Sequence, residues 1–178
     1  MQSMRRTNWY VISGAPCSGK TSVIKALEQQ GFRVVHEVAR AYIDRELGQG
    51  KNLEQIKADP DQFENHILLT KLKIEASLPS DEIVFLDRAV PDSIAYFQLE
   101  GLDPGQPVEK SKAVRYRKIF LFERLAFLKD GVRSEDDDLA DRLDNLLETA
   151  YRKLSYEIVR VPAISVDERT AFILERLE

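Results

Sequence analysis

Eight consecutive residues near the start of the chain have the types and the spacing of a phosphate-binding loop. They are Gly14-Ala15-Pro16-Cys17-Ser18-Gly19-Lys20-Thr21, which fit the pattern G-x-x-x-x-G-K-[ST] without a mismatch. Glycines let the backbone turn its N–H groups inward around phosphate oxygens, and the N-terminus of a following helix adds partial positive charge. In such a loop Lys20 reaches the β- and γ-phosphates, and the Thr21 hydroxyl binds Mg²⁺. The segment therefore predicts a site for a nucleoside triphosphate and Mg²⁺.

Asp87 and Arg88 are the next candidates for phosphoryl chemistry. They follow the apolar run 83–86, which is typical of a buried strand. At the end of such a strand a carboxylate can meet Mg²⁺ directly or through water, and an arginine can reach a phosphate or a substrate group. The alternatives are a polar strand end for Asp87 and a surface ion pair for Arg88. We favour the metal role for Asp87.

Glu37 follows the apolar run 32–35 and is the candidate general base. A carboxylate at that place could take a proton from an acceptor hydroxyl or hold a metal-bound water. It could equally be a first-turn glutamate that the helix dipole favours. A third possibility is an ion pair with Arg40, three residues later on the same helical face.

Two arginines, Arg124 and Arg133, bracket the polar stretch after the apolar run 118–122. Phosphoryl transfer develops charge on the equatorial oxygens, which a closing arginine can stabilise. Either arginine could instead be a solvated loop charge. The acidic run 135–138 favours a charged helix start over a metal site.

Five short apolar runs predict the buried strands that must position these residues: 9–13, 32–35, 83–86, 118–122 and 158–161. Helices are predicted between and after them: 22–30, from 37 to near 48, from Asp59 to before Pro79, 91–99, from a cap at Ser134 through Leu154, and after a capping box of Ser165 and Glu168. Residues 101–107 predict a surface loop because they hold glycines and prolines. The alternation implies an α/β fold, in which ligands bind at the carboxyl ends of the strands.

Composition excludes several other classes of protein. The 178 residues suit a single domain, 1–178, and 43% hydrophobic with 31% charged residues is typical of a globular protein in water. The net charge of −4 argues against bulk nucleic-acid binding. The single cysteine and the separated His36 and His66 exclude a disulfide within the chain and a zinc cluster. With no long apolar run we expect no transmembrane segment and a cytoplasmic protein.

Five stretches that span nearly the whole chain resemble the P-loop kinase superfamily: residues 12–21, 36–40, 86–93, 130–133 and 161–169. Within it they are similar to the small AAA-type ATPase/kinase-like family, which is itself similar to the ribosylnicotinamide kinase domain. The resemblance implies a three-layer fold, with a five-stranded parallel sheet flanked by helices and a short lid. It also implies ATP, or GTP, with Mg²⁺ as cofactors.

The resemblance also implies roles for individual residues by motif position. The loop from Gly14 to Ser22 would hold the nucleotide, with Lys20 on the phosphates and Thr21 and Asp87 on Mg²⁺. Arg88 would be a substrate-side or phosphate-side arginine and Glu37 the candidate base. Arg133 would be the lid arginine, Arg124 a further nucleotide contact, and Pro162 and Ala163 would lie beside the base.

Two functions of different classes remain open at this point. The first is an ATP-dependent kinase of a small nucleoside-like metabolite, whose acceptor the sequence does not name. The second is a nucleotide-controlled binding module or slow NTPase with a protein or lipid partner. A basic cluster would suit a lipid surface, although we favour a solvated helix face for it: Lys110, Lys112, Arg115, Arg117 and Lys118. The chain has no N-K-x-D motif, which argues against a Ras-like switch and favours ATP over GTP.

Overall fold

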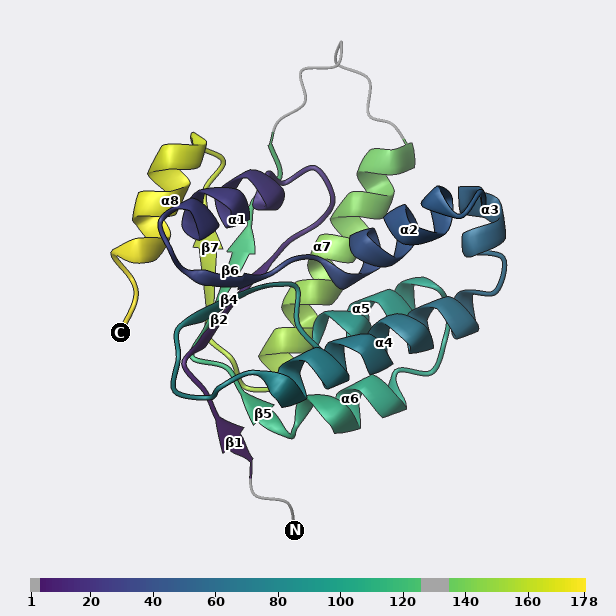
Figure 1. The fold of residues 1–178 in the computed structure, drawn as a ribbon, viewed down its shortest axis with the longest axis horizontal. Coiled ribbons are helices and arrows are strands. Elements are labelled where there is room, and N and C mark those ends of the chain that lie inside the picture. The colour runs from purple at the N-terminus through teal and green to yellow at the C-terminus, as the bar shows by residue number, and fades with distance from the viewer. Residues whose placement is uncertain (1–3, 126–134) are drawn as a thin grey trace.

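A five-stranded parallel sheet forms the centre of the protein, whose computed structural model describes residues 4–125 and 135–178 (Figure 1). Its strands, in spatial order, are β3 (Arg33–Val35), β4 (Val84–Asp87), β2 (Trp9–Ser13), β6 (Lys118–Phe122) and β7 (Ile158–Val161). All four neighbouring pairs are parallel. The predicted α/β fold with a five-stranded parallel sheet and all five predicted strands are confirmed, whereas the lid arginine, Arg133, lies outside the described residues.

Helices cover both faces of this sheet. They are α1 (Lys20–Gln29), α2 (Val38–Gly48), α3 (Leu53–Ile56), α4 (Pro60–Ser77), α5 (Asp92–Leu99), α6 (Gly105–Ser111), α7 (Glu135–Lys153) and α8 (Val166–Leu174). Helices α1 and α8 pack on one face, where Ile24 and Ile173 meet Ile12 of β2. Helix α7 covers the other face, where Tyr151 meets Val11. Alternate residues of β2 thus enter two separate cores, as a strand buried on both faces requires.

Helix boundaries follow the predicted caps in several places. Gln62 donates its backbone N–H to the Asp59 side chain at 3.0 Å, so α4 begins where the sequence predicted. The capping box of Ser165 and Glu168 opens α8 as expected. The predicted cap at Ser134 lies outside the described residues. Among the helices that the structure describes, none is long and apolar enough to cross a membrane.

The sequence prediction was wrong at three smaller elements. Residues 101–107 are not wholly a loop, because α6 begins at Gly105. Helix α3 was missed; Asn52 and Gln55 form its capping box. A separate two-stranded sheet of β1 (Arg5–Arg6) and β5 (Val114–Arg115) was also missed. These strands are two residues long, too short for an alternating pattern to be visible.

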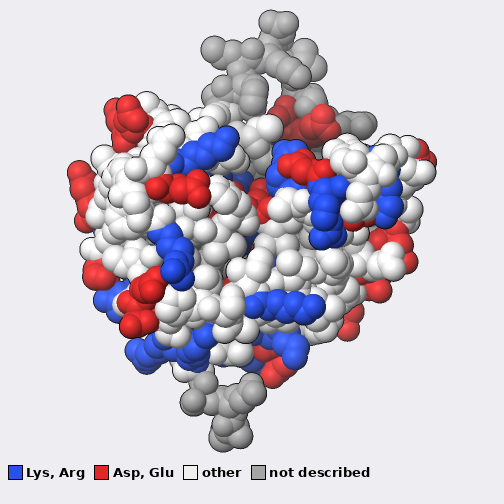
Figure 2. All heavy atoms as spheres, in the orientation of Figure 1, with Lys and Arg blue, Asp and Glu red and all other residues white. Residues whose placement is uncertain are grey.

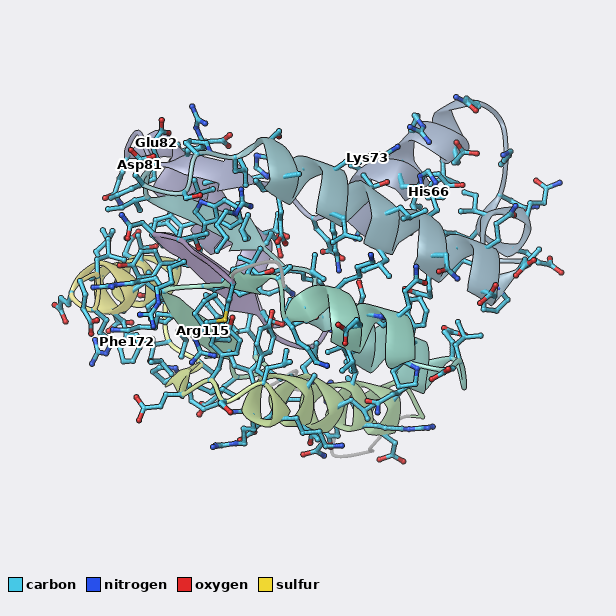
Figure 3. All side chains as sticks on the ribbon, turned by 90° about the horizontal axis from the view of Figure 1, so that it is seen from below. His66, Lys73, Asp81, Glu82, Arg115 and Phe172 are labelled. Carbon is cyan, nitrogen blue, oxygen red and sulfur yellow. The ribbon has the colours of Figure 1, made fainter. Side chains whose placement is uncertain are left out.

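The basic cluster of residues 110–118 is not the solvated helix face that we expected. Arg115 lies on β5, where it donates to the Leu154 and Ser155 carbonyls at 2.9 and 2.7 Å (Figure 3). Lys118 begins β6 and pairs with Glu178 at 2.9 Å, while Lys112 pairs with Glu109 at 2.7 Å. Figure 2 shows basic and acidic side chains interspersed over the face in view. Much of the cluster is therefore engaged within the protein.

Candidate functional site

The loop between β2 and α1 has positive φ angles at three of its residues. Gly14 has φ +145° and Gly19 has φ +82°, a region that favours glycine. A Cβ on Gly14 would lie 2.9 Å from the Phe122 carbonyl oxygen, so the close approach of β6 also requires glycine there. Cys17, at φ +61°, is exposed, whereas the buried Ser18 hydroxyl has no hydrogen-bond partner among the described residues.

Lys20 is the first residue of α1, and its side chain is enclosed by charged neighbours. Only 6% of the residue is exposed. Burial, followed by the positive charge of Arg88, lowers the pKa of Lys20 to about 8, against the opposing effect of Asp87 and Glu37. The structure therefore brings together Lys20, Asp87, Arg88 and Glu37, which the sequence placed at the ends of three different strands.

Asp87 is a buried carboxylate at the end of β4. It is in register with Ile12 of β2, so it lies beside the start of the phosphate loop. The residue is 3% exposed, and burial raises the pKa of its carboxyl to about 6 despite the nearby Lys20. Its Oδ1 has no hydrogen-bond partner among the described residues. An unpartnered buried carboxylate oxygen is a hard ligand of the kind that Mg²⁺ prefers.

Arg88, directly after β4, contacts both β2 and Glu37. Its φ is +65°, and its backbone N–H donates to the Ile12 carbonyl at 3.0 Å. Its guanidinium lies 3.4 Å from a Glu37 oxygen and 5.3 Å from the centre of the Tyr96 ring. Burial alone would lower the pKa of Arg88, but Tyr96, Glu37 and Asp92 raise it above its ordinary value. The ion-pair partner of Glu37 is thus Arg88.

Asp92, in the first turn of α5, is a central residue of the site that sequence reasoning missed. It is fully buried and accepts hydrogen bonds from the Ser13 hydroxyl, the Tyr151 hydroxyl and the Ala89 N–H. Its Oδ1 lies 3.6 Å from Arg88. The only signal in the sequence was its position four residues after Arg88, which is also the position of an ordinary first-turn aspartate.

Helix α4 brings buried charges that the sequence did not single out. The Lys71 ammonium is buried and donates to the Ser93 hydroxyl at 3.1 Å. Burial lowers the pKa of Lys71, with Asp92 and Arg88 among the charges that it feels. Burial also raises the pKa of Glu64, about two helical turns before Lys71 on the same helix, to about 7. Buried charged groups of α4 therefore lie next to the first turn of α5.

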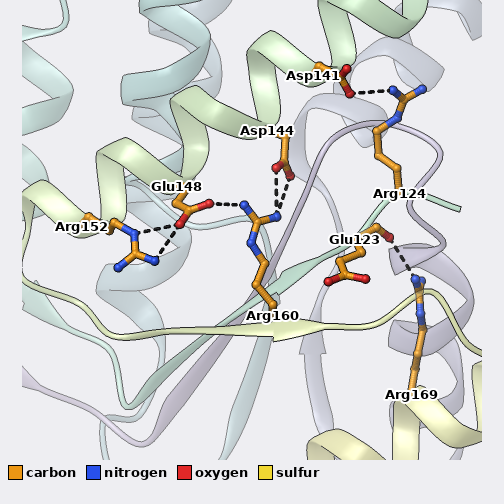
Figure 4. Close-up of polar contacts among 8 residues, drawn as sticks. All are labelled: Glu123, Arg124, Asp141, Asp144, Glu148, Arg152, Arg160 and Arg169. Atoms are coloured by element: carbon orange, nitrogen blue, oxygen red, sulfur yellow. Dashed lines mark hydrogen bonds and ion pairs between the residues drawn. The ribbon is translucent and has the colours of Figure 1, made fainter.

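Arg124 follows β6 and is anchored to helix α7 (Figure 4). Its guanidinium lies 2.7 Å from Asp137 and 3.0 Å from Asp141. The acidic run 135–138 is the start of α7, as the sequence favoured. Arg133 lies outside the described residues. Pro162 and Ala163 directly follow β7. The exposed Leu125 lies close to the phosphate loop, because a Cβ placed on Gly19 would be 3.3 Å from its side chain.

The two histidines are both exposed, and neither contacts Lys20, Glu37, Asp87 or Arg88 among the contacts of the described residues. His36 lies 3.1 Å from Glu28 of α1. His66 lies on α4, with its ring 4.4 Å from the ring of Tyr42 (Figure 3).

The arrangement defines the class of P-loop kinase-like folds: a strand, a glycine-bearing loop, a helix that starts with a buried lysine, and an aspartate at the end of a neighbouring strand. The chain belongs to the AAA domain family, whose model matches residues 9–169. A comparison with curated protein sequences gave no match.

Solved structures with a similar fold include kinases of nucleosides and nucleotides. Thymidylate kinase from Ehrlichia chaffeensis is similar with a TM-score of 0.68 and 14% identity, over 97% of this chain and 99% of that one. Deoxyadenosine kinase from M. mycoides, with the products dCMP and dCDP bound, has a TM-score of 0.64 and 14% identity, over 95% and 97%.

The NadR protein in complex with NR has a TM-score of 0.64 and 18% identity, over 87% of this chain and 45% of that one. This chain therefore spans less than half the length of NadR. At these identities the likenesses establish a P-loop nucleoside and nucleotide kinase fold.

Proposed function

We propose that the chain binds ATP through residues 14–22 and, with Mg²⁺, transfers the γ-phosphoryl group to a small nucleoside-like metabolite. The observation that carries this proposal is the convergence of Lys20, Asp87 and the Glu37–Arg88 ion pair directly after the phosphate loop. Phosphoryl transfer requires a cation on the phosphates, a carboxylate for the metal, and groups that orient the acceptor. GTP is the less favoured donor.

Thr21 and Asp87 are the residues that would hold Mg²⁺. Asp87 offers a buried oxygen without a hydrogen-bond partner among the described residues, and Thr21 is exposed at the start of α1. Mg²⁺ would neutralise charge on the phosphate oxygens. Since the pKa of Asp87 is about 6, its carboxyl is largely ionised at neutral pH and suited to a cation.

Glu37 and Arg88 would serve the acceptor. The Glu37 side chain is 27% exposed, so it is accessible from the site and held by Arg88 at the same time. It would take the proton of the attacking hydroxyl while Arg88 orients its carboxylate. Arg124, Pro162 and Ala163 would contact the nucleotide from the β6 and β7 side.

Arg133 stays a proposed phosphate contact on sequence grounds. Its expected role is to close over the transferring phosphoryl group and stabilise the charge that develops on it.

The proposal is tested by separating nucleotide binding from transfer. Lys20→Ala should weaken ATP binding at least about tenfold in calorimetry, because a cation that contacts the phosphates is lost. Lys25→Ala, an exposed lysine on the same helix, is the matched control and should bind ATP as the wild type does. Unchanged ATP affinity in Lys20→Ala would contradict the assignment of the loop.

Glu37→Gln tests the transfer step. It should leave ATP binding within about tenfold while reducing transfer of labelled γ-phosphate to pooled nucleosides at least about a hundredfold. Glu28→Gln, which removes an exposed carboxylate of α1, serves as the control. If the wild type binds ATP tightly and labels no acceptor, a nucleotide-controlled binding module replaces the kinase proposal.

A further inference from the structure

Arg169 of α8 is a buried arginine that connects three separate segments of the chain. Only 1% of the residue is exposed. Its Nε donates to the Pro162 carbonyl at 2.7 Å, its Nη2 to the Glu123 carbonyl at 2.9 Å (Figure 4), and its Nη1 to the Ser18 carbonyl. These carbonyls belong to the loop after β7, the segment after β6, and the phosphate loop.

The chemistry of the guanidinium explains why an arginine occupies this position. The carbonyls of Glu123 and Pro162, just after β6 and β7, accept part-buried hydrogen bonds, and the Ser18 carbonyl accepts a buried one, so all three are backbone acceptors that benefit from a donor within the protein. A planar guanidinium offers five N–H donors in a fixed fork and can serve carbonyls in three directions, which the compact ammonium of a lysine cannot match. The group also lies 4.9 Å from the centre of the Phe122 ring, which packs against it.

Arg169 is itself fixed in place by the start of its helix. The capping box of Ser165 and Glu168 sets the first turn of α8, and the Arg169 N–H donates to the Ser165 carbonyl at 2.9 Å. The approach to the phosphate loop is close, because a Cβ on Gly19 would lie 3.0 Å from Arg169 Nη1. The guanidinium therefore has one arrangement, packed directly under the end of the loop.

We propose that Arg169 is the positioning residue that holds the phosphate loop in its binding conformation and connects it to residues 162–164. The Ser18 carbonyl and the Gly19 N–H belong to one planar trans peptide, so they point in opposite directions. Holding the carbonyl toward α8 turns the Gly19 N–H away from α8 and toward the phosphate side of the loop. This inference takes the nucleotide ligand from the proposed function. It assigns a role to Arg169 that requires no contact between Arg169 and the substrate.

The same contacts connect the two parts of the nucleotide site. The Pro162 carbonyl that Arg169 holds belongs to the loop proposed to lie beside the base, whereas the Ser18 carbonyl belongs to the phosphate cradle. Loss of Arg169 therefore disturbs the phosphate side directly. Inorganic tripolyphosphate, which has no base, is the probe that isolates this effect from any change in base binding.

The test compares Arg169→Ala and Arg169→Lys with the wild type by calorimetry, using ATP and tripolyphosphate as ligands. Both variants should bind both ligands about tenfold to a hundredfold more weakly, the range for loss of a buried charge-assisted hydrogen bond. Arg160→Ala is the matched control. The Arg160 guanidinium pairs with Asp144 and Glu148 of α7 (Figure 4), contacts that do not involve the phosphate loop, and its loss should leave both affinities within about twofold.

A chemical rescue distinguishes positioning from a general loss of stability. Guanidinium at millimolar concentration should restore at least about tenfold of the lost tripolyphosphate affinity in Arg169→Ala, because it can re-enter the vacated site. It should change nothing in the Arg160 variant, and sodium chloride at equal ionic strength should not rescue. Arg169→Lys keeps the measurement possible if the alanine variant does not fold.

The outcomes separate this inference from the proposed function. Wild-type affinity for tripolyphosphate in both Arg169 variants, or a loss confined to ATP, overturns the positioning role. Weakened binding without guanidinium rescue overturns it too. If both variants bind weakly with rescue, but the wild type transfers no phosphate, the positioning role stands and the kinase proposal fails. A wild type that binds neither ligand overturns both.

Discussion

Asp92 provides the sharpest test of the buried network behind the phosphate loop. Its two oxygens accept three hydrogen bonds and lie close to Arg88. In Asp92→Asn one acceptor becomes an NH₂ donor. If the nitrogen takes the Oδ2 position it faces the Ala89 N–H, whose present acceptor is 2.9 Å away, and if it takes the Oδ1 position it faces the guanidinium. Neither orientation of the amide satisfies all of its neighbours.

The expected loss of stability follows from these contacts. Loss of a hydrogen bond to a buried charge costs about 1.5 to 3 kcal/mol, and a buried arginine that loses a carboxylate neighbour adds to it. We therefore expect Asp92→Asn to lower the free energy of unfolding by about 2 to 4 kcal/mol. In a chain of this size 1 kcal/mol corresponds to about 2 to 4 °C in Tm, so Tm should fall by about 4 to 16 °C.

Thermal unfolding measured by circular dichroism checks this value, with two controls. Tyr151→Phe removes one donor to the same carboxylate, a loss of about 1.5 to 3 kcal/mol, and should lower Tm by about 3 to 12 °C, less than Asp92→Asn does. Asp81→Asn changes an exposed aspartate before β4 (Figure 3) and should lie within about 1 °C of the wild type. An Asp92→Asn protein that melts within about 2 °C of the wild type would refute the reasoning.

Three further predictions concern the metal, the loop thiol and pH. Asp87→Asn should abolish the strengthening of ATP binding by Mg²⁺ in calorimetry but keep metal-free binding; wild-type magnesium dependence would remove Asp87 from the site. Mg·ATP should slow alkylation of the exposed Cys17 by iodoacetamide, measured by mass spectrometry, and equal rates would show that Cys17 faces away from the phosphates. Burial raises the pKa of Glu75 from 4.5 to about 7, so its stabilising neutral form is fully present below about pH 4.5 and lost as pH rises through about 7. Glu75→Gln should remove this decline, at most roughly 3 kcal/mol, from urea unfolding measured between pH 5 and 8, and an unchanged pH profile would contradict it.

The phosphate loop and the five strands could be predicted from the sequence because their determinants are local. The loop pattern, the apolar run before it and the helical pattern after it are contiguous, and each buried strand is a continuous apolar run. The carboxyl-end rule for parallel sheets then placed Glu37 and Asp87 near the loop. The structure brings these two residues together with Lys20, as the sequence predicted.

The residues that hold the site could not be found in the same way, because their partners are distant in sequence. Arg169 and Ser18 are separated by 151 positions, and Tyr151 and Asp92 by 59. A polar side chain on a helix gives no sign of which remote carbonyl or carboxylate it will meet. The burial of Lys71 could not be predicted either, because a lysine in an amphipathic helix is ordinarily solvated.

Two of these missed residues, Asp92 and Arg169, have a common feature: each connects the phosphate loop, or the end of the strand before it, to helices that cover one face of the sheet. Asp92 connects Ser13, the last residue of β2, to α5 and α7 on one face, whereas Arg169 connects Ser18 to α8 on the other. Because a phosphate cradle binds through backbone N–H groups, its affinity depends on the orientation of its peptides as well as on side chains such as Lys20. Buried polar groups on both sides can set that orientation before any nucleotide arrives, which is the arrangement that a preorganised phosphate site requires.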